Sequence, residues 1–129
     1  MEKVSGIYCI RNKIDDKVYI GLSSNIYARW QTHKTKLNSL SHINKHLQSS
    51  WTKYGEDAFE FSILELCDDI NLLPDMEIKW IARYNSSDKK FGYNMTSGGM
   101  GTKDLSEESR AEGRKKYKHL EEWDINKLK

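Results

Sequence analysis

The sequence predicts a small α/β domain of the α+β type, in which short strands are flanked by helices. Two β-prone runs lie on either side of a polar connection near the N-terminus, which is the pattern of a hairpin. Three later segments carry apolar residues at helical spacing, and residues 59–66 alternate apolar with polar side chains. A chain of 129 residues has the usual size of a single domain. It can form a modest core, but not two domains with a deep cleft between them.

The first predicted feature is the hairpin formed by residues 5–10 and 17–21. A four-residue loop at 12–15 pairs Arg11 with Asp16 and places Tyr8 directly opposite Tyr19. Because strand side chains alternate between the two faces of a sheet, both phenols should project from one face.

Two helices are predicted to follow the hairpin. The first, over 26–37, is preceded by three suitable N-cap residues, Ser23, Ser24 and Asn25. Its apolar stripe consists of Ile26, Trp30, His33 and Leu37. Arg29 and His33 are i, i+4 neighbours and can therefore reach a common point. The second helix, over 43–54, ends at Gly55, and its stripe consists of Ile43, Leu47, Trp51 and Tyr54.

A third strand is predicted over 59–66 and a third helix over 74–84, where Pro74 stands in the first turn. Glu77 lies beside the apolar stripe of that helix. Residues 91–96 can form a short closing strand before a glycine-rich break at 97–101. A capping box at 104–107 predicts a charged helix that ends near residue 123. We therefore expect a domain over 1–99 and a linker or helical tail over 100–129.

Charge is distributed unevenly along the chain, although the net charge is only +2. Residues 1–54 carry nine Lys and Arg against three acidic residues, whereas the remaining residues carry 12 basic and 16 acidic ones. A basic, aromatic-rich half suits a polyanion such as nucleic acid. A solvated charged face is the commoner meaning of such an imbalance, so charge alone does not decide the function.

Several features of the sequence bear on its location. The mean hydropathy is −0.80, and no apolar run reaches the roughly 18 residues that a membrane span requires. The first ten residues lack the features of a signal peptide. Cys9 and Cys67 do not form a CxxC pair, which excludes a cysteine-based zinc site and favours a reducing compartment. We expect a soluble, cytoplasmic protein with no membrane partner.

Two tripeptides on the predicted hairpin carry the functional signal, Gly6-Ile7-Tyr8 and Tyr19-Ile20-Gly21. Each is a weak signal alone, but the pair at this spacing resembles the signature of the GIY-YIG nuclease family. Further positions match in the family's order, namely Arg29, Trp30, His33, His42, Glu77, Trp80, Ile81 and the run Gly92-Tyr93-Asn94. The resemblance covers about residues 4–99, and its pattern is that of the catalytic domains of phage homing endonucleases. It implies a three-stranded antiparallel β-sheet flanked by helices.

The residues at these positions suit phosphodiester hydrolysis. This reaction requires an activated water, neutralisation of charge on the phosphate and stabilisation of the leaving oxygen. Arg29 can donate a fork of hydrogen bonds to phosphate, and Glu77 is a hard oxygen ligand that suits Mg²⁺ or Mn²⁺. Tyr8, Tyr19 and His33 can each relay a proton, position the water or hold the phosphate, and the residues alone leave these roles open.

The resemblance implies roles for individual residues. The catalytic set would be Tyr8, Tyr19, Arg29, His33, His42 and Glu77. Tyr8 would act as the general base, and Glu77 would hold one divalent ion near the leaving group. A tyrosine base requires a cation beside it, because the pKa of a free phenol is near 10. The site would be supported by Gly6, Gly21 and Asn94, and DNA would be bound by Lys34, Lys36 and Lys45.

Each of these residues also has a purely structural explanation when it is judged alone. Tyr8 and Tyr19 can be an ordinary cross-strand pair, and Glu77 can be a carboxylate stabilised near a helix N-terminus. Their joint occurrence in order favours one site, and hence a metal-dependent DNA endonuclease that uses Mg²⁺ or Mn²⁺. The alternatives are a non-catalytic nucleic-acid-binding domain on the same scaffold and a restriction or repair nuclease. Since the sequence contains no zinc finger or helix-turn-helix module, a DNA-targeting module or a dimer partner outside this chain is a further expectation.

Overall fold

Three antiparallel strands form one sheet in the part of the chain that the structure describes, residues 3–98 of a computed structural model. The strands are β1 (Gly6–Asn12), β2 (Val18–Ser23) and β3 (Phe59–Leu66), in the order β2-β1-β3. Helices α1 (Ile26–Asn38) and α2 (Lys45–Tyr54) follow the hairpin, and a short 3₁₀ helix, η1 (Glu56–Ala58), leads into β3. Helix α3 (Leu73–Tyr84) follows β3. The predicted fold class is confirmed, whereas the predicted tail helix over 104–123 lies outside the described residues.

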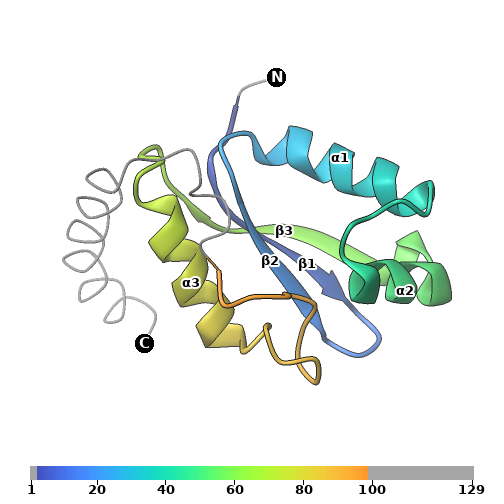
Figure 1. Cartoon of the computed structure of the whole chain (residues 1–129). Helices are drawn as coiled ribbons and strands as arrows, with labels where there is room; N and C mark the ends of the chain where they lie inside the picture. Colours follow the sequence, from blue (N-terminus) through green and yellow to red (C-terminus); the bar gives the residue numbers. More distant parts are fainter. Residues whose placement is uncertain (1–2, 99–129) are drawn as a thin grey trace.

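Helices cover both faces of the sheet, with α1 and α2 on one face and α3 on the other (Figure 1). Alternate side chains of β1 therefore enter two different cores. Ile7 and Cys9 pack in the core under α3, whereas Tyr8 and Ile10 pack in the core under α1 and α2. Because both faces are buried, residues 6–10 of β1 form a continuous apolar run and do not alternate with polar residues. None of the helices in residues 3–98 is long and apolar enough to cross a membrane.

The hairpin register differs from the predicted one. Tyr8 lies opposite Gly21, and Tyr19 lies opposite Ile10. The loop occupies residues 13–16, because the backbone N–H of Asn12 donates to the carbonyl of Lys17 at 2.9 Å. The predicted loop at 12–15, and with it the placement of Tyr8 directly opposite Tyr19, was therefore wrong. A one-residue shift of the loop moves the pairing by two positions, so both phenols still share a face, with ring centroids 6.4 Å apart.

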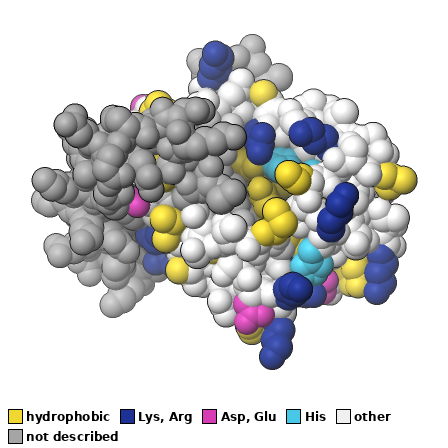
Figure 2. Space-filling view, in the orientation of Figure 1, with side chains coloured by type: hydrophobic (Ala, Val, Ile, Leu, Met, Phe, Trp, Pro, Cys, Tyr) yellow, Lys and Arg dark blue, Asp and Glu magenta, His cyan; other side chains and the backbone are white. Residues whose placement is uncertain are grey.

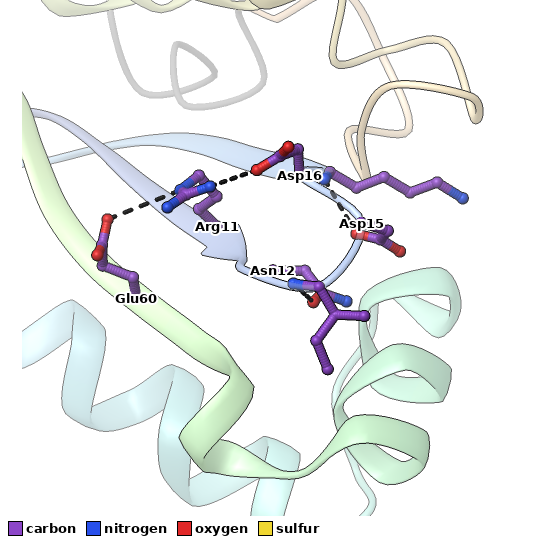
Figure 3. A network of polar contacts seen from close by, with 7 residues as sticks. Arg11, Asn12, Asp15, Asp16 and Glu60 are labelled. Carbon is purple, nitrogen blue, oxygen red and sulfur yellow. Dashed lines mark hydrogen bonds and ion pairs between the residues drawn. The ribbon is translucent and has the colours of Figure 1, made fainter.

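Polar side chains hold the start of this loop in place (Figure 3). Arg11 forms an ion pair with Asp16 and another, at 3.7 Å, with Glu60 of β3. The predicted pairing of Arg11 with Asp16 is thus made by side chains and not by the backbone ladder. Asn12 is fully buried. Its Oδ1 accepts from the backbone N–H of Ile14 at 2.9 Å and its Nδ2 donates to Tyr93 Oη at 3.1 Å, which keeps Asn12 in the strand.

Two asparagines determine where the first two helices begin. Asn25 caps α1, because its Oδ1 accepts from the backbone N–H of Ala28 at 3.3 Å. Asn44 caps α2 in the same way through the backbone N–H of Leu47 at 3.0 Å, so α2 begins two residues later than predicted. Ile43 therefore precedes the helix and is 77% exposed, and its assignment to the apolar stripe was wrong.

The outer edge of β2 is closed by residues 91–94. Val18 donates its N–H to the carbonyl of Phe91 at 3.3 Å and accepts from the N–H of Tyr93 at 2.9 Å. The backbone of Ile20 is paired by a side chain: its N–H donates to Asn94 Oδ1 at 2.9 Å, and its carbonyl accepts from Asn94 Nδ2 at 2.8 Å. The predicted closing strand over 91–96 was wrong, since only an isolated bridge forms in this segment. The side-chain amide of Asn94 thus makes the two hydrogen bonds to Ile20 that the backbone of a neighbouring strand would otherwise make.

Replacing Asn94 with alanine is expected to lower the free energy of unfolding by about 2–4 kcal/mol. The change removes both bonds to Ile20, whose side chain is fully buried, and a third bond from Ser86 Oγ to Asn94 Oδ1 at 2.7 Å. Urea denaturation measures the effect. Met95→Ala is the matched control, because Met95 is 68% exposed and should change stability by less than about 0.5 kcal/mol. Equal effects of the two variants would contradict the role of Asn94 at the sheet edge.

Candidate active site

The two tyrosines of the signature tripeptides meet on the face of the sheet that α1 covers. Tyr8 is 1% exposed, and its ring makes edge contacts with Trp30 and His33 at centroid distances of 6.4 and 5.7 Å. Tyr19 also contacts His33, at a centroid distance of 5.4 Å. One face of the molecule shows histidine and hydrophobic side chains bordered by several Lys and Arg side chains (Figure 2). Strands β1 and β2 and helix α1 thus bring their polar aromatic side chains to one place.

A chain of hydrogen bonds runs from Tyr8 into the interior. Tyr8 Oη lies 2.7 Å from His33 Nε2, and His33 Nδ1 lies 2.8 Å from His42 Nε2. At the far end, His42 Nδ1 accepts from the backbone N–H of Asn44 at 3.0 Å. Both histidines are 3% exposed. His42, which follows α1, is therefore connected to Tyr8 through His33.

The two histidines are held in their neutral forms. Burial, together with the charges of His42, Arg29 and Lys36, lowers the pKa of His33 to about 3. Burial also lowers the pKa of His42, with Lys36 and Arg29 acting in the same direction. At neutral pH each ring of this pair therefore carries one proton and has one nitrogen that can only accept.

Lowering the pH from 6.5 toward 3 is expected to destabilise the fold through His33. The unfolded chain takes up a proton on this histidine below about pH 6.5, whereas the folded chain does so only near pH 3, so the unfolded state binds more protons in this window. Each pH unit can remove up to about 1.4 kcal/mol from the free energy of unfolding. Urea denaturation at several pH values measures the slope, which should be shallower for His33→Gln. Identical slopes for the two proteins would contradict the assignment.

The charges of Arg29 on α1 and Glu77 on α3 both influence the pKa values of Tyr8 and Tyr19. Burial is the largest influence and raises the pKa of Tyr8 and of Tyr19. Glu77, itself 8% exposed, raises both pKa values further, whereas the guanidinium of Arg29 lowers both and hydrogen-bonds Tyr8. Both phenols are therefore neutral at neutral pH. The structure brings Tyr8, Tyr19, Arg29, His33 and Glu77 into electrostatic contact from four different elements.

Two glycines stand where a side chain would not fit. A Cβ on Gly21 would lie 2.4 Å from both Cζ and Oη of Tyr8, so the missing side chain leaves the space that the phenol fills. A Cβ on Gly6 would lie 2.0 Å from the carbonyl oxygen of Glu65 in β3. Gly21 thus determines where the hydroxyl of Tyr8 lies, and Gly6 allows β1 and β3 to approach beside it.

The three lysines predicted to bind DNA lie in different surroundings. Lys36 is exposed in the last turn of α1, and its charge acts on both His33 and His42. Lys34 is half-buried, and its Nζ lies 4.9 Å from the ring centroid of Phe61. Lys45 is exposed at the first residue of α2. Of these three lysines, Lys36 therefore influences the site around Tyr8 through its charge, which lowers the pKa values of the two histidines.

Asn44 is the residue of this site that sequence reasoning missed. It is 2% exposed, caps α2 and donates its backbone N–H to the end of the histidine chain. An asparagine directly before an amphipathic helix is a recognisable N-cap signal, and it could have revealed the start of α2. The bond from its backbone to His42 has no sequence signature, because backbone N–H groups are common to all residues except proline.

Glu77 is the carboxylate that this site offers to a metal ion. Within residues 3–98, no three or more His, Cys, Asp or Glu side chains are grouped so that they could hold one together. Mg²⁺ and Mn²⁺ prefer oxygen ligands, and Mg²⁺ commonly binds through one or two carboxylates while water and substrate phosphate complete its shell. A single buried carboxylate beside two phenols fits an ion of this kind, and it does not fit zinc, which takes three or four protein ligands.

The sheet order, the paired tripeptides and the residues gathered around Tyr8 define a GIY-YIG catalytic domain. The family model described as the GIY-YIG catalytic domain matches residues 4–94, and the chain belongs to this family. The family resemblance inferred from the two tripeptides is thereby confirmed. Nucleases of this family generally use a divalent metal ion.

Two relatives carry the names of intron endonucleases. The chain is 38% identical over 98 residues to intron-associated endonuclease 1 of Enterobacteria phage T4, covering 75% of this chain and 39% of that protein. It is 34% identical over 86 residues to the probable intron-encoded endonuclease 1 of Neurospora crassa, covering 62% of this chain and 27% of that protein. The chain therefore spans well under half the length of either relative.

Solved structures of a homing endonuclease domain share the fold. The catalytic domain of homing endonuclease I-TevI matches with a TM-score of 0.66 and 38% identity, over 71% of this chain and 98% of that one. A mutant form of the same catalytic domain matches with a TM-score of 0.67 and 36% identity, over 73% and 95% of the two chains. The similarity thus covers almost the whole of that catalytic domain.

Proposed function

We propose that this domain is an endonuclease that hydrolyses DNA phosphodiester bonds with the help of one divalent ion, Mg²⁺ or Mn²⁺. The observation that carries the proposal is the meeting of two phenols, a guanidinium, a neutral histidine and a buried carboxylate in one site. The endonuclease names of the two relatives support it. These groups supply the proton acceptor, the phosphate ligand and the metal ligand that the reaction needs.

Tyr8 is the proposed general base. As the phenolate, it takes a proton from the attacking water while the water oxygen forms a bond to phosphorus. The bond from phosphorus to the leaving sugar oxygen breaks, and that oxygen takes up a proton from solvent. Arg29 donates to the phosphate oxygens, where negative charge increases in the transition state. Tyr19, close to both Tyr8 and His33, orients the water or the phosphate.

Tyr8 must lose its own proton before it can act, and burial opposes this loss because it raises the pKa of the phenol. Arg29 works in the opposite direction. A divalent ion at Glu77 would add positive charge that lowers the phenol pKa further and neutralises the phosphate. Glu77 without an ion raises the pKa of both phenols, so the same carboxylate favours a neutral Tyr8 until its charge is balanced.

Binding to DNA is proposed to rest on the phosphate backbone, through Lys34, Lys36 and Lys45 beside Arg29. Contacts of this kind carry little sequence information and weaken with salt. We assign catalysis to residues 1–99 and a linking role to residues 100–129. Choice of the target is left to a DNA-targeting module or to a second copy of the domain. The proposed place of action is the cytoplasm of a bacterial or phage-infected cell.

Cleavage of supercoiled plasmid at low salt with Mg²⁺ tests the proposal. Nicked or linear product is expected from the wild type, and it should disappear with EDTA and in Tyr8→Phe, which lacks the phenolic hydroxyl. Tyr27→Phe is the matched control, since Tyr27 is an exposed residue of α1 and its variant should cleave normally. Salt-dependent binding of a folded wild type without any product would overturn the proposal in favour of a non-catalytic DNA-binding domain.

A further inference from the structure

The hydrogen-bond chain behind Tyr8 has a fixed direction, because it begins at a group that can only donate. The backbone N–H of Asn44 points at His42 Nδ1, so this nitrogen must be the accepting one. A neutral imidazole carries a single proton, and in His42 that proton is therefore on Nε2. From Nε2 it is donated to His33 Nδ1, 2.8 Å away.

The proton position of the next ring, His33, is fixed in the same way. Since His33 Nδ1 accepts from His42, the proton of neutral His33 is on Nε2. This atom lies 2.7 Å from Tyr8 Oη, so His33 is the donor and the phenolic oxygen is the acceptor. The two imidazole planes are tilted by only 20°, which lets the lone pair of one ring lie near the N–H direction of the other. Because the pKa values of both histidines are lowered, neither imidazole takes up a second proton at neutral pH.

The first donor of the hydrogen-bond chain, the backbone N–H of Asn44, is held in place by the bonds around it. Asn44 Oδ1 accepts from the backbone N–H of Leu47 at 3.0 Å, and its Nδ2 donates to the carbonyl of Tyr93 at 2.6 Å. The backbone N–H of His42 donates to Gln48 Oε1 at 3.1 Å. Both ends of the Asn44 side chain and the backbone of His42 are thus fixed to other elements. The N–H of Asn44 cannot turn away without breaking the cap of α2.

We propose that His42 is a positioning residue that selects the Nε2–H tautomer of His33, so that His33 donates to Tyr8 and cannot accept its proton. The hydroxyl hydrogen of Tyr8 is then directed away from His33, and the phenolate, once formed, receives a hydrogen bond from His33. The proposal deepens the proposed function, because it excludes His33 as the acceptor of the Tyr8 proton. It makes no use of a metal ion.

A pair of variants with nearly the same shape tests the direction of the chain. In His42→Gln, the side-chain oxygen can accept from the N–H of Asn44 while the amide NH₂ donates to His33 Nδ1, which keeps the original direction. In His42→Glu, the carboxylate accepts from both neighbours, so His33 must place its proton on Nδ1 and accept from Tyr8 at Nε2. Nitrogen NMR of labelled histidine at mildly alkaline pH distinguishes the two neutral tautomers.

The Nε2–H tautomer of His33 is expected in the wild type and in His42→Gln, and the Nδ1–H tautomer in His42→Glu. His46 is not part of the hydrogen-bond chain, so His46→Gln should leave the His33 signal unchanged. This variant also helps to assign the His33 signal. An Nδ1–H tautomer of His33 in the wild type would overturn the proposal, even if neither position 42 variant folds. The measurement needs no DNA, so its outcome is separate from that of the cleavage assay.

Discussion

Glu77→Gln is expected to lower the cleavage of supercoiled plasmid about 1000-fold while the domain stays folded. Glutamine keeps the shape of the side chain and removes its negative charge, so the proposed metal ligand is lost and the surrounding packing is preserved. Glu77 is 8% exposed, on α3 beside β2. Rates are measured in the single-turnover regime with saturating Mg²⁺, which separates a loss of chemistry from weaker DNA binding.

A second readout from the same variant needs no cleavage. Glu77 raises the pKa of Tyr19 and of Tyr8, so Glu77→Gln should lower the pKa of both phenols. Absorbance titration of the tyrosines at alkaline pH measures this change. Glu60→Gln is the control, because Glu60 lies on β3 and pairs with Arg11, and its variant should keep both full cleavage and the wild-type pKa of Tyr8 and Tyr19. Full cleavage by Glu77→Gln would remove Glu77 from the catalytic machinery.

Gly21→Ala is expected to reduce cleavage at least about 100-fold, because small displacements of a reacting group have effects of this size. The new methyl group would lie 2.4 Å from Cζ and Oη of Tyr8, which is closer than real contacts allow. The phenol must therefore leave its position, and its hydrogen bond to His33 Nε2 must lengthen or break. The change also inserts volume into a packed core, which costs about 1–3 kcal/mol of stability.

Gly55→Ala provides the comparison for this loss. Nothing lies within 4 Å of a Cβ at this position, but Gly55 ends α2 with a positive φ of 87°, which costs an alanine about 1 kcal/mol or more. This variant should lose stability while its folded form cleaves normally. Cleavage rates are compared at a temperature where both variants are folded, as judged by circular dichroism. A Gly21→Ala protein that cleaves like Gly55→Ala would show that the position of the Tyr8 hydroxyl is not critical.

Most of the fold could be predicted from local sequence signals. The third strand occupies the predicted residues 59–66, and α1 and α3 lie within one residue of the predicted ranges. The hairpin register could not be read in this way. It depends on burial of Asn12 and on a hydrogen bond to Tyr93, which is 81 residues away along the chain. The edge of β2 depends in the same way on Asn94, 74 residues from Ile20.

The sequence predicts which residues form the candidate site better than it predicts the hydrogen bonds that join them. Tyr8, Tyr19, Arg29 and Glu77 were named from the sequence, and the structure brings them together. From the sequence, His42 is a candidate catalytic residue. In the structure it contacts His33 and reaches Tyr8 only through that residue. This difference arises because the link runs through the backbone of Asn44, and only a folded chain determines which N–H faces which ring nitrogen.

The closed edge of β2 has a consequence for how two copies of the domain can assemble. The backbone groups of Val18 and Ile20 are already bonded to residues 91–94, so a strand from another molecule finds no partners at those two residues. If a double-strand break requires two copies, each facing one strand of the duplex, their sheets cannot join there into a continuous sheet. The relative orientation of the two sites would then be determined by other surfaces of the domain or by the DNA itself.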